Sequence, residues 1–151
     1  MKYELRGRIT GLESAPVFQD WFKRFNDWRS PSLGKRGERL AAKWLKKRGY
    51  RVVAQSAKEL GGEIDLVARH GATWVFVEVK TRTTADFGQP WEAVGAVKER
   101  RIAQAARLFL HRRKIHDAPT RFDVVSIVWP QNGTGDPEVV HYPDAFQPSG
   151  I

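Results

Sequence analysis

The fold of this chain is decided by residues 63–80, which read Glu-Ile-Asp-Leu-Val-Ala-Arg-His-Gly-Ala-Thr-Trp-Val-Phe-Val-Glu-Val-Lys. Two largely apolar runs, residues 63–69 and 74–80, stand on either side of a short polar connection. Runs of this composition favour strands, and glycine at the first central position of a two-residue connection is typical of a type II′ hairpin turn. The stretch therefore predicts two antiparallel strands that close about Gly71 and Ala72.

This hairpin brings two carboxylates together. Asp65 is the sixth residue before Gly71 and Glu78 is the sixth after Ala72, so the two lie opposite each other if the hairpin closes symmetrically. Opposed residues on antiparallel strands have Cβ atoms about 4.5–5.5 Å apart. Like charges so placed oppose folding and raise one pKa unless a cation lies between them. Mg²⁺ suits this position, with Mn²⁺ as an alternative, because it prefers oxygen and is typically held by one or two carboxylates plus substrate phosphate.

Lys80 points to the same face as Glu78, because strand side chains alternate. A lysine beside a metal site can orient the attacking water and offset phosphate charge. Val79 points the other way, and its backbone carbonyl is available as a metal ligand. The alternative is a salt bridge between Asp65 and Lys80, with Glu78 solvated. A strand that is apolar on both faces is normally buried, where charges are costly unless they are paired or bind metal, so the metal site is favoured.

Helical spacing and turn residues predict the other elements. We expect helices at residues 14–29, 30–48 and 91–113, and further strands at 50–55, 121–129 and 138–142. The aromatic stripe of the first helix suits a membrane, DNA or another subunit, but packing on its own domain is preferred. We divide the chain into an N-terminal extension (1–33), one domain (34–146) and a loose tail (147–151). Glu38 on the second helix is either a third acid aimed at the sheet or a surface residue favoured by the helix dipole, and its spacing does not choose.

The charge of the chain favours a polyanionic partner. Its 151 residues include 26 Lys and Arg against 17 Asp and Glu, which gives a net charge of +9. Nucleic acid is the preferred partner, ahead of an anionic membrane surface or a merely well-solvated surface. The absence of cysteine excludes disulfides, thiolate metal sites and a cysteine nucleophile. No apolar run approaches the roughly 20 residues that span a bilayer, so we expect a cytoplasmic protein without membrane association.

The third predicted helix is a candidate site of contact with the nucleic-acid backbone, and the alternative is a solvated helix face. Its cations are Lys98, Arg100, Arg101, Arg107, Arg112, Arg113 and Lys114. Lys98 and Arg101 are the contacts selected from this helix, Lys98 because the family resemblance given below includes it. Arg82 and Gln89 in the loop after Lys80 are weaker candidates. Such contacts give affinity without sequence readout. No two histidines have metal-ligand spacing, and Asp123 is expected to be a structural hydrogen-bond acceptor.

Several of these residues form motifs of a known family. Glu63-Ile64-Asp65-Leu66 followed by Phe76-Val77-Glu78-Val79-Lys80 resembles the PD-(D/E)XK nuclease superfamily, with Ile64 in place of the usual proline. More narrowly, residues 34–128 resemble the YraN family, which is classed as endonuclease-like with a Holliday-junction-resolvase type of fold. The narrower resemblance rests on Gly37-Glu38, Gly62 to Asp65, residues 76–82, Phe87-Gly88 and Lys98.

The resemblance implies an α/β fold with an αβββαβ restriction-endonuclease-like core, in which helices flank a central mixed sheet; here an extra N-terminal helix precedes it. It implies that Asp65, Glu78 and the Val79 carbonyl hold the metal, that Lys80 is catalytic and that Glu38 is an auxiliary acid. The expected function is metal-dependent endonuclease action on DNA, with branched or damaged DNA as candidate substrates, and a homodimer is expected by analogy. The alternative is a nucleic-acid-binding module with little catalysis. A glycosidase explains neither Lys80 nor the positive charge.

Overall fold

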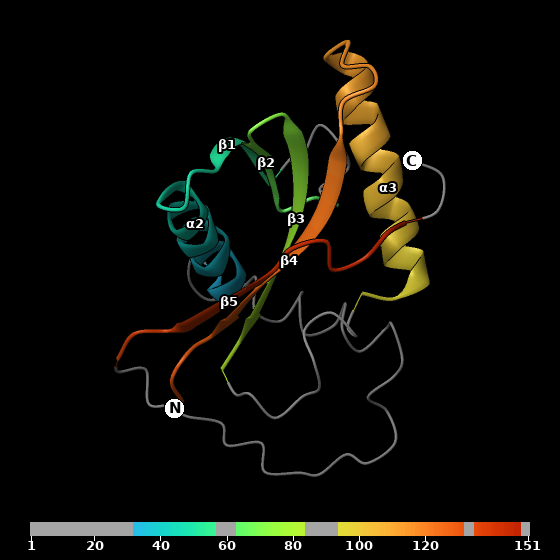
Figure 1. The fold of residues 1–151 in the computed structure, drawn as a ribbon. Coiled ribbons are helices and arrows are strands. Elements are labelled where there is room, and N and C mark those ends of the chain that lie inside the picture. The colour runs from blue at the N-terminus through green and yellow to red at the C-terminus, as the bar shows by residue number, and fades with distance from the viewer. Residues whose placement is uncertain (1–31, 57–62, 84–93, 132–134, 149–151) are drawn as a thin grey trace.

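A five-stranded sheet with one helix on each face forms the body of the protein in a computed structural model, which describes residues 32–56, 63–83, 94–131 and 135–148. Figure 1 shows α2 and α3 on opposite sides of the sheet. The elements are α2 (Leu33–Lys46), β1 (Arg51–Gln55), β2 (Leu66–His70), β3 (Thr73–Arg82), α3 (Ala96–Arg112), β4 (Thr120–Val128) and β5 (Glu138–Tyr142). The helix predicted at residues 14–29 lies outside the described residues.

The strands follow one another across the sheet in the order β1-β2-β3-β4-β5. Only the β3–β4 pair is parallel, because α3 connects these two strands and returns the chain to the same end of the sheet. The other three pairs are antiparallel. This arrangement is the predicted αβββαβ core with a mixed sheet, extended by β5 at one edge.

The hairpin has the predicted register. Leu66 pairs with Val77 and His70 with Thr73, and Gly71 between them has φ = +60°, as a type II′ turn requires at this position. The first strand, however, begins at Leu66 and not at residue 63. Asp65 lies just before it, where its side chain and not its backbone bonds to β3, so the prediction that Asp65 lies within a paired strand was wrong by one residue.

Alternation along the strands divides the core into two layers. Val67 and Phe76 face α3, where they pack with Phe109 and its neighbours. Val75 and Val77 face α2, where they pack with Leu45 and others. A sheet buried on both faces needs strands that are apolar on both faces, as β3 is. Any charged side chain on β3 therefore projects into one of these two layers.

The two helices begin in different ways. Ser32 caps α2, and its hydroxyl accepts a hydrogen bond from the Lys35 amide at 3.3 Å. α3 begins at Ala96, and the described residues Val94 and Gly95 precede it. The predicted start of this helix at residue 91 was therefore too early. Gly95 occupies the N-cap position without a side chain to bond there, so periodicity alone did not reveal the boundary.

Candidate active site

Asp65 and Glu78 lie on the α3 side of the sheet, at the end of β3 that points away from the hairpin turn. Asp65 is two residues from Val67, and Glu78 is two residues from Phe76. The acids therefore share the face of the sheet on which Val67 and Phe76 pack. Both side chains are buried, with 9% and 4% of the residue exposed. One carboxylate oxygen of Asp65 accepts a hydrogen bond from the Val79 amide at 2.8 Å. The sequence thus predicted correctly that these two acids would meet.

The burial of Asp65 makes its charged form costly. Burial raises the pKa of Asp65 well above its usual value, and the nearby charge of Glu78 raises it further. The hydrogen bond from Val79 acts in the opposite direction but does not compensate. A cation bound at this position would offset both the cost of burying the Asp65 charge and its repulsion by Glu78. This is the electrostatic condition for a cation site.

Lys80 pairs with Glu78, and not with Asp65. Its Nζ atom lies 3.0 Å from the Glu78 carboxylate, and its side chain keeps 21% exposure. The alternative interpretation, an Asp65–Lys80 salt bridge beside a solvated Glu78, was therefore wrong. Lys80 stands at the edge between the buried carboxylates and solvent, where an anion in solution can reach it.

Lys98 in the first turn of α3 also contacts Glu78. Its Nζ atom lies 3.6 Å from Glu78 and 3.7 Å from Glu63. Burial disfavours the charge of Lys98, but Glu78, Asp65 and Glu63 outweigh burial and raise its pKa. Sequence reasoning assigned Lys98 to the nucleic-acid backbone and gave Glu63 no role of its own. The only sequence signal for Glu63 was its position two residues before Asp65.

Glu38 is linked to the site through Ser56, the residue that follows β1. Its carboxylate accepts a hydrogen bond from the hydroxyl of Ser56, whose backbone amide in turn donates to the Asp65 carbonyl at 2.7 Å. The charge of Glu38 is close enough to contribute to the raised pKa of Asp65. Glu38 is half-buried, which favours the interpretation as a third acid over that of a surface residue. Ser56 was not singled out by the sequence.

The side chains present fit a hard divalent cation. Within the four described segments, no three or more His, Cys, Asp or Glu side chains are grouped as a metal site. Mg²⁺ does not require such a cage, because one or two carboxylates with water and substrate phosphate suffice. Asp65 and Glu78 supply two carboxylates that are adjacent and buried, and their oxygen chemistry suits Mg²⁺ or Mn²⁺.

The other predicted contacts are dispersed. Arg101 is 59% exposed and lies 4.0 Å from Glu63, so it extends the charged cluster toward solvent. Arg82 ends β3, where its carbonyl accepts a hydrogen bond from the Trp129 amide at 2.8 Å. Gln89 lies outside the described residues. Lys98 and Arg101 are thus the predicted cations that the structure places beside the acids.

A second polar cluster lies on the α2 side of the sheet. Asp123 is fully buried and accepts hydrogen bonds from Arg121 at 2.8 and 2.9 Å, from His141 at 2.8 Å and from the Asp144 amide at 3.0 Å. Arg121 also donates to the hydroxyl of Tyr50 at 2.9 Å. Asp123 is therefore the structural hydrogen-bond acceptor that the sequence predicted.

This fold, with an acid before β2 and Glu-x-Lys on β3, defines a protein of the PD-(D/E)XK nuclease-like superfamily. Residues 37–127 match the uncharacterised protein family UPF0102, and the chain belongs to this family. The fold and the family match confirm the resemblance that the motifs indicated.

The similar proteins come from diverse bacteria. A UPF0102 protein of Geobacter metallireducens is 44% identical over 117 residues, which cover 77% of this chain and 93% of the relative. One from Symbiobacterium thermophilum is 47% identical over 98 residues, covering 65% and 83%. The names of these relatives state membership of the family and no activity. Among the described residues, neither helix has the length and apolar character needed to cross a bilayer.

Proposed function

We propose that this protein is a metal-dependent endonuclease that hydrolyses phosphodiester bonds in DNA. The observation that supports the proposal best is the placement of Asp65 and Glu78, two buried neighbouring carboxylates, beside Lys80 and Lys98. Two acids alone suit several kinds of hydrolase. Acids that flank a cation site and have lysines at their solvent side suit a phosphate substrate, because the substrate itself is anionic.

Asp65, Glu78 and the Val79 carbonyl would hold the metal ion. When bound, Mg²⁺ supplies Lewis-acid polarisation of the phosphoryl oxygen and lowers the pKa of water. Lys80 orients the attacking water and stabilises the negative charge that develops on the phosphorane-like transition state. Lys98 neutralises the charge of Glu78 when the substrate is absent. Glu38 accepts a hydrogen bond from the Ser56 hydroxyl, and the Ser56 amide in turn holds the backbone carbonyl of Asp65 in position.

The test is cleavage of labelled duplex, single-stranded and four-way-junction DNA with Mg²⁺, Mn²⁺ or EDTA. Glu78→Gln and Lys80→Ala keep most of the local packing and should lower the cleavage rate by roughly 10²-fold or more. Glu78→Gln removes the charge of a metal-holding residue, and Lys80→Ala removes a positive charge at the reacting phosphate. Glu138→Gln makes the same chemical change on the exposed side of β5 and should cut like wild type. Cleavage that survives EDTA, or that Glu78→Gln does not affect, would exclude the proposed site.

A nucleic-acid-binding module with little catalysis is the second candidate. The observation in its favour is that Lys80 and Lys98 both lie against Glu78, so that the charge of Glu78 is already matched without a metal ion. In that case the same residues would form a basic contact to phosphate and not a metal site. Binding without cutting under every metal condition would support this candidate.

A further inference from the structure

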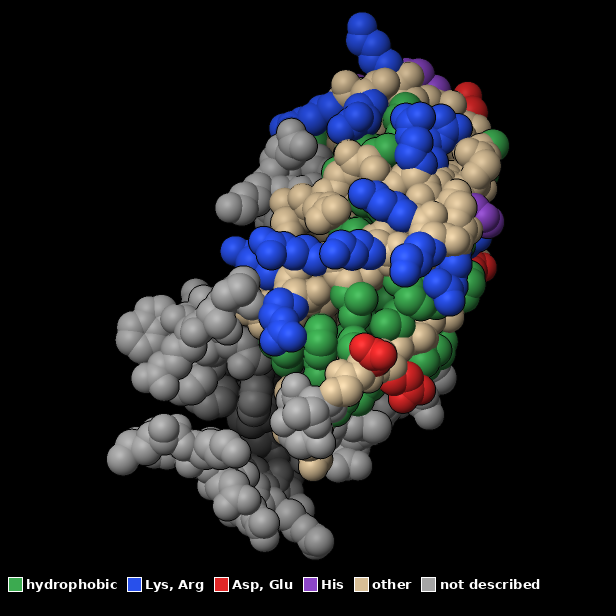
Figure 2. All heavy atoms as spheres, turned by 90° about the vertical axis from the view of Figure 1, so that its left-hand side faces the viewer, with side chains coloured by type: hydrophobic (Ala, Val, Ile, Leu, Met, Phe, Trp, Pro, Cys, Tyr) green, Lys and Arg blue, Asp and Glu red, His purple; other side chains and the backbone are tan. Residues whose placement is uncertain are grey.

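The outward face of α2 differs from an ordinary solvated helix surface. It displays six exposed cations, which we call the α2 basic face: Lys35, Arg36, Arg39, Lys43, Lys46 and Lys47. Successive residues of a helix are about 100° apart, so these positions fall within about one third of its circumference. Glu38, the one acid of α2, points elsewhere and bonds to Ser56. Figure 2 shows Lys and Arg side chains spread over this side of the molecule, with acidic side chains much sparser.

This arrangement opposes the stability of the helix itself. Pairs such as Arg39 with Lys43 and Lys43 with Lys47 place like charges four residues apart, which is destabilising. Lys35 and Arg36 lie in the first turn, where the helix dipole favours acids, and no acid is present there. Solvated helix faces normally intersperse both signs of charge. Among the ion pairs within the described segments, none involves a cation of the α2 basic face. A polyanion would offset this repulsion.

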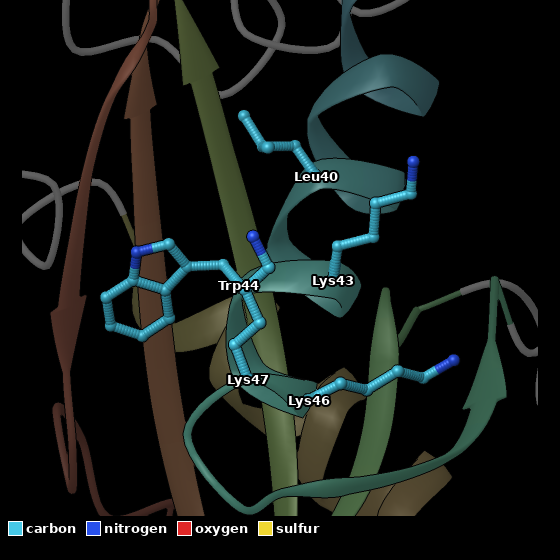
Figure 3. A pocket seen from close by; sticks show the side chains of 5 residues that line it. All are labelled: Leu40, Lys43, Trp44, Lys46 and Lys47. Carbon is cyan, nitrogen blue, oxygen red and sulfur yellow. The ribbon is translucent and has the colours of Figure 1, made fainter.

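The surface also has a shape that suits the backbone of a nucleic acid. A hollow of about 320 Å³ is lined by Leu40, Lys43, Trp44, Lys46 and Lys47. Its walls are the leucine, the indole and the lysine stems, and in Figure 3 the ammonium groups stand apart from one another around it. An apolar hollow with a cationic rim accommodates a sugar or base between two phosphates. An isolated small anion would gain nothing from the apolar walls.

The length of the face matches such a partner. From Lys35 to Lys47 the helix rises about 18 Å. Duplex DNA has one charge per about 1.7 Å of axis, so the same length presents about ten phosphates. The N-terminal end of α2 also lies close to the end of β3 that carries the candidate active site, because Gly37 lies against Thr81, the residue after Lys80. A duplex that follows α2 therefore leads toward the end of β3 where the acids lie.

We infer that the α2 basic face is a docking surface for the sugar-phosphate backbone of duplex DNA, on the side of the sheet opposite to Lys98 and α3. The inference rests on the proposed function in taking DNA as the partner, but it requires no catalysis. It assigns to α2 a role that the sequence did not predict, since the expected contacts were on α3 and in the loop after β3.

The test measures binding of labelled duplex DNA in EDTA over a range of salt concentrations. The variant Lys43→Gln/Lys46→Gln/Lys47→Gln removes three cations that line the hollow. If each contacts a phosphate, the slope of log affinity against log salt should fall by roughly 2–3. The control variant is Arg51→Gln, which removes one exposed cation from the edge strand β1, outside both α2 and α3. This control should keep the wild-type slope.

Circular dichroism of both variants checks that they fold, which is expected because the α2 changes relieve repulsion. An equal loss of slope per removed charge in both variants would overturn the inference, since net charge alone would then explain binding. A wild-type slope in the α2 variant would also overturn it. Wild-type binding to phosphatidylserine vesicles that the α2 variant loses, with DNA binding unchanged, would reassign the face to a membrane surface.

The inference and the proposed function fail separately. If no metal condition gives cleavage but the α2 variant still loses its salt slope, the nuclease proposal fails and the docking surface stands. If cleavage depends on metal and on Glu78 while the α2 variant binds like wild type, the docking surface fails alone.

Discussion

Two buried aspartates of this protein lie in opposite electrostatic surroundings. Burial and the nearby charge of Glu78 raise the pKa of Asp65, and the hydrogen bond from one backbone amide offsets them only in part. Burial also disfavours the charge of Asp123, but hydrogen bonds from His141 and Arg121 outweigh burial and lower its pKa. The difference separates two roles for the same residue type. The carboxylate whose charge is unsatisfied belongs to the candidate active site, and the satisfied one holds the structure together.

The structural role of Asp123 predicts a loss of stability in Asp123→Asn. Removing one partner of a buried, hydrogen-bonded charge pair should lower the free energy of unfolding by about 3 kcal/mol at neutral pH. Because the folded-state pKa of Asp123 is depressed, its ionised form stabilises the fold above the unfolded pKa of about 3.9, and this contribution disappears as pH falls through the lower folded pKa. Urea denaturation of both proteins between neutral and acid pH measures the difference.

Asp144→Asn is the control for this experiment, because it makes the same change on an exposed residue. It should change the free energy of unfolding by no more than about 0.5 kcal/mol. A difference between wild type and Asp123→Asn that is equally large at acid and neutral pH would contradict an ionised Asp123.

At the level of elements, α2 is held against β3 by a close approach that only glycine permits. Gly37 is buried in the helix, and a Cβ atom added there would overlap the hydroxyl oxygen of Thr81. Glycine in a helix ordinarily costs stability relative to alanine. The contact reverses that preference, because Thr81 belongs to a central strand that has little freedom to move.

Gly37→Ala should therefore destabilise the protein by about 1–3 kcal/mol through overpacking. Gly34→Ala provides the comparison, since the added Cβ would lie 3.8 Å from the Ser32 hydroxyl oxygen, an ordinary contact. That variant should be neutral or more stable by up to about 1 kcal/mol. Thermal or urea unfolding of the two variants gives the result, and an equal gain in both would show that α2 can move away from β3.

At the scale of the whole molecule, both helices begin beside the same short stretch of β3. Gly37 in α2 lies against Thr81, and Lys98 in α3 contacts Glu78. The positive ends of both helix dipoles are thus directed toward the region of the candidate active site, from opposite faces of the sheet. Together with the net charge of +9, this placement favours an anionic substrate at that end of the molecule.

The same architecture predicts how protection from hydrogen exchange is distributed. β3 pairs on both sides and is covered by helices on both faces, whereas β1 and β5 are the edges of the sheet. Backbone amides of β3 and β4 should exchange slowest, close to the global unfolding limit, and those of the edge strands faster. Hydrogen exchange followed by NMR tests this order. Edge amides that exchange as slowly as those of β3 would indicate that the edges are covered by other parts of the chain or by a second copy.

The sequence by itself determined the hairpin, its register and the meeting of Asp65 with Glu78. These features depend on residues close together in the chain, where a turn and the alternation of strand side chains leave few arrangements. The family motifs added the order of the remaining elements.

Only the tertiary structure decided the surroundings of these residues. The contacts of Lys98 with Glu78, of Glu38 with Ser56 and of Asp123 with His141 join segments far apart in the chain. Spacing within one element shows which way a side chain faces, but its partner depends on where another element packs. The α2 basic face depends on both the sequence and the tertiary structure. The helical period places its cations in one stripe, and the packing of α2 on the sheet leaves that stripe facing outward.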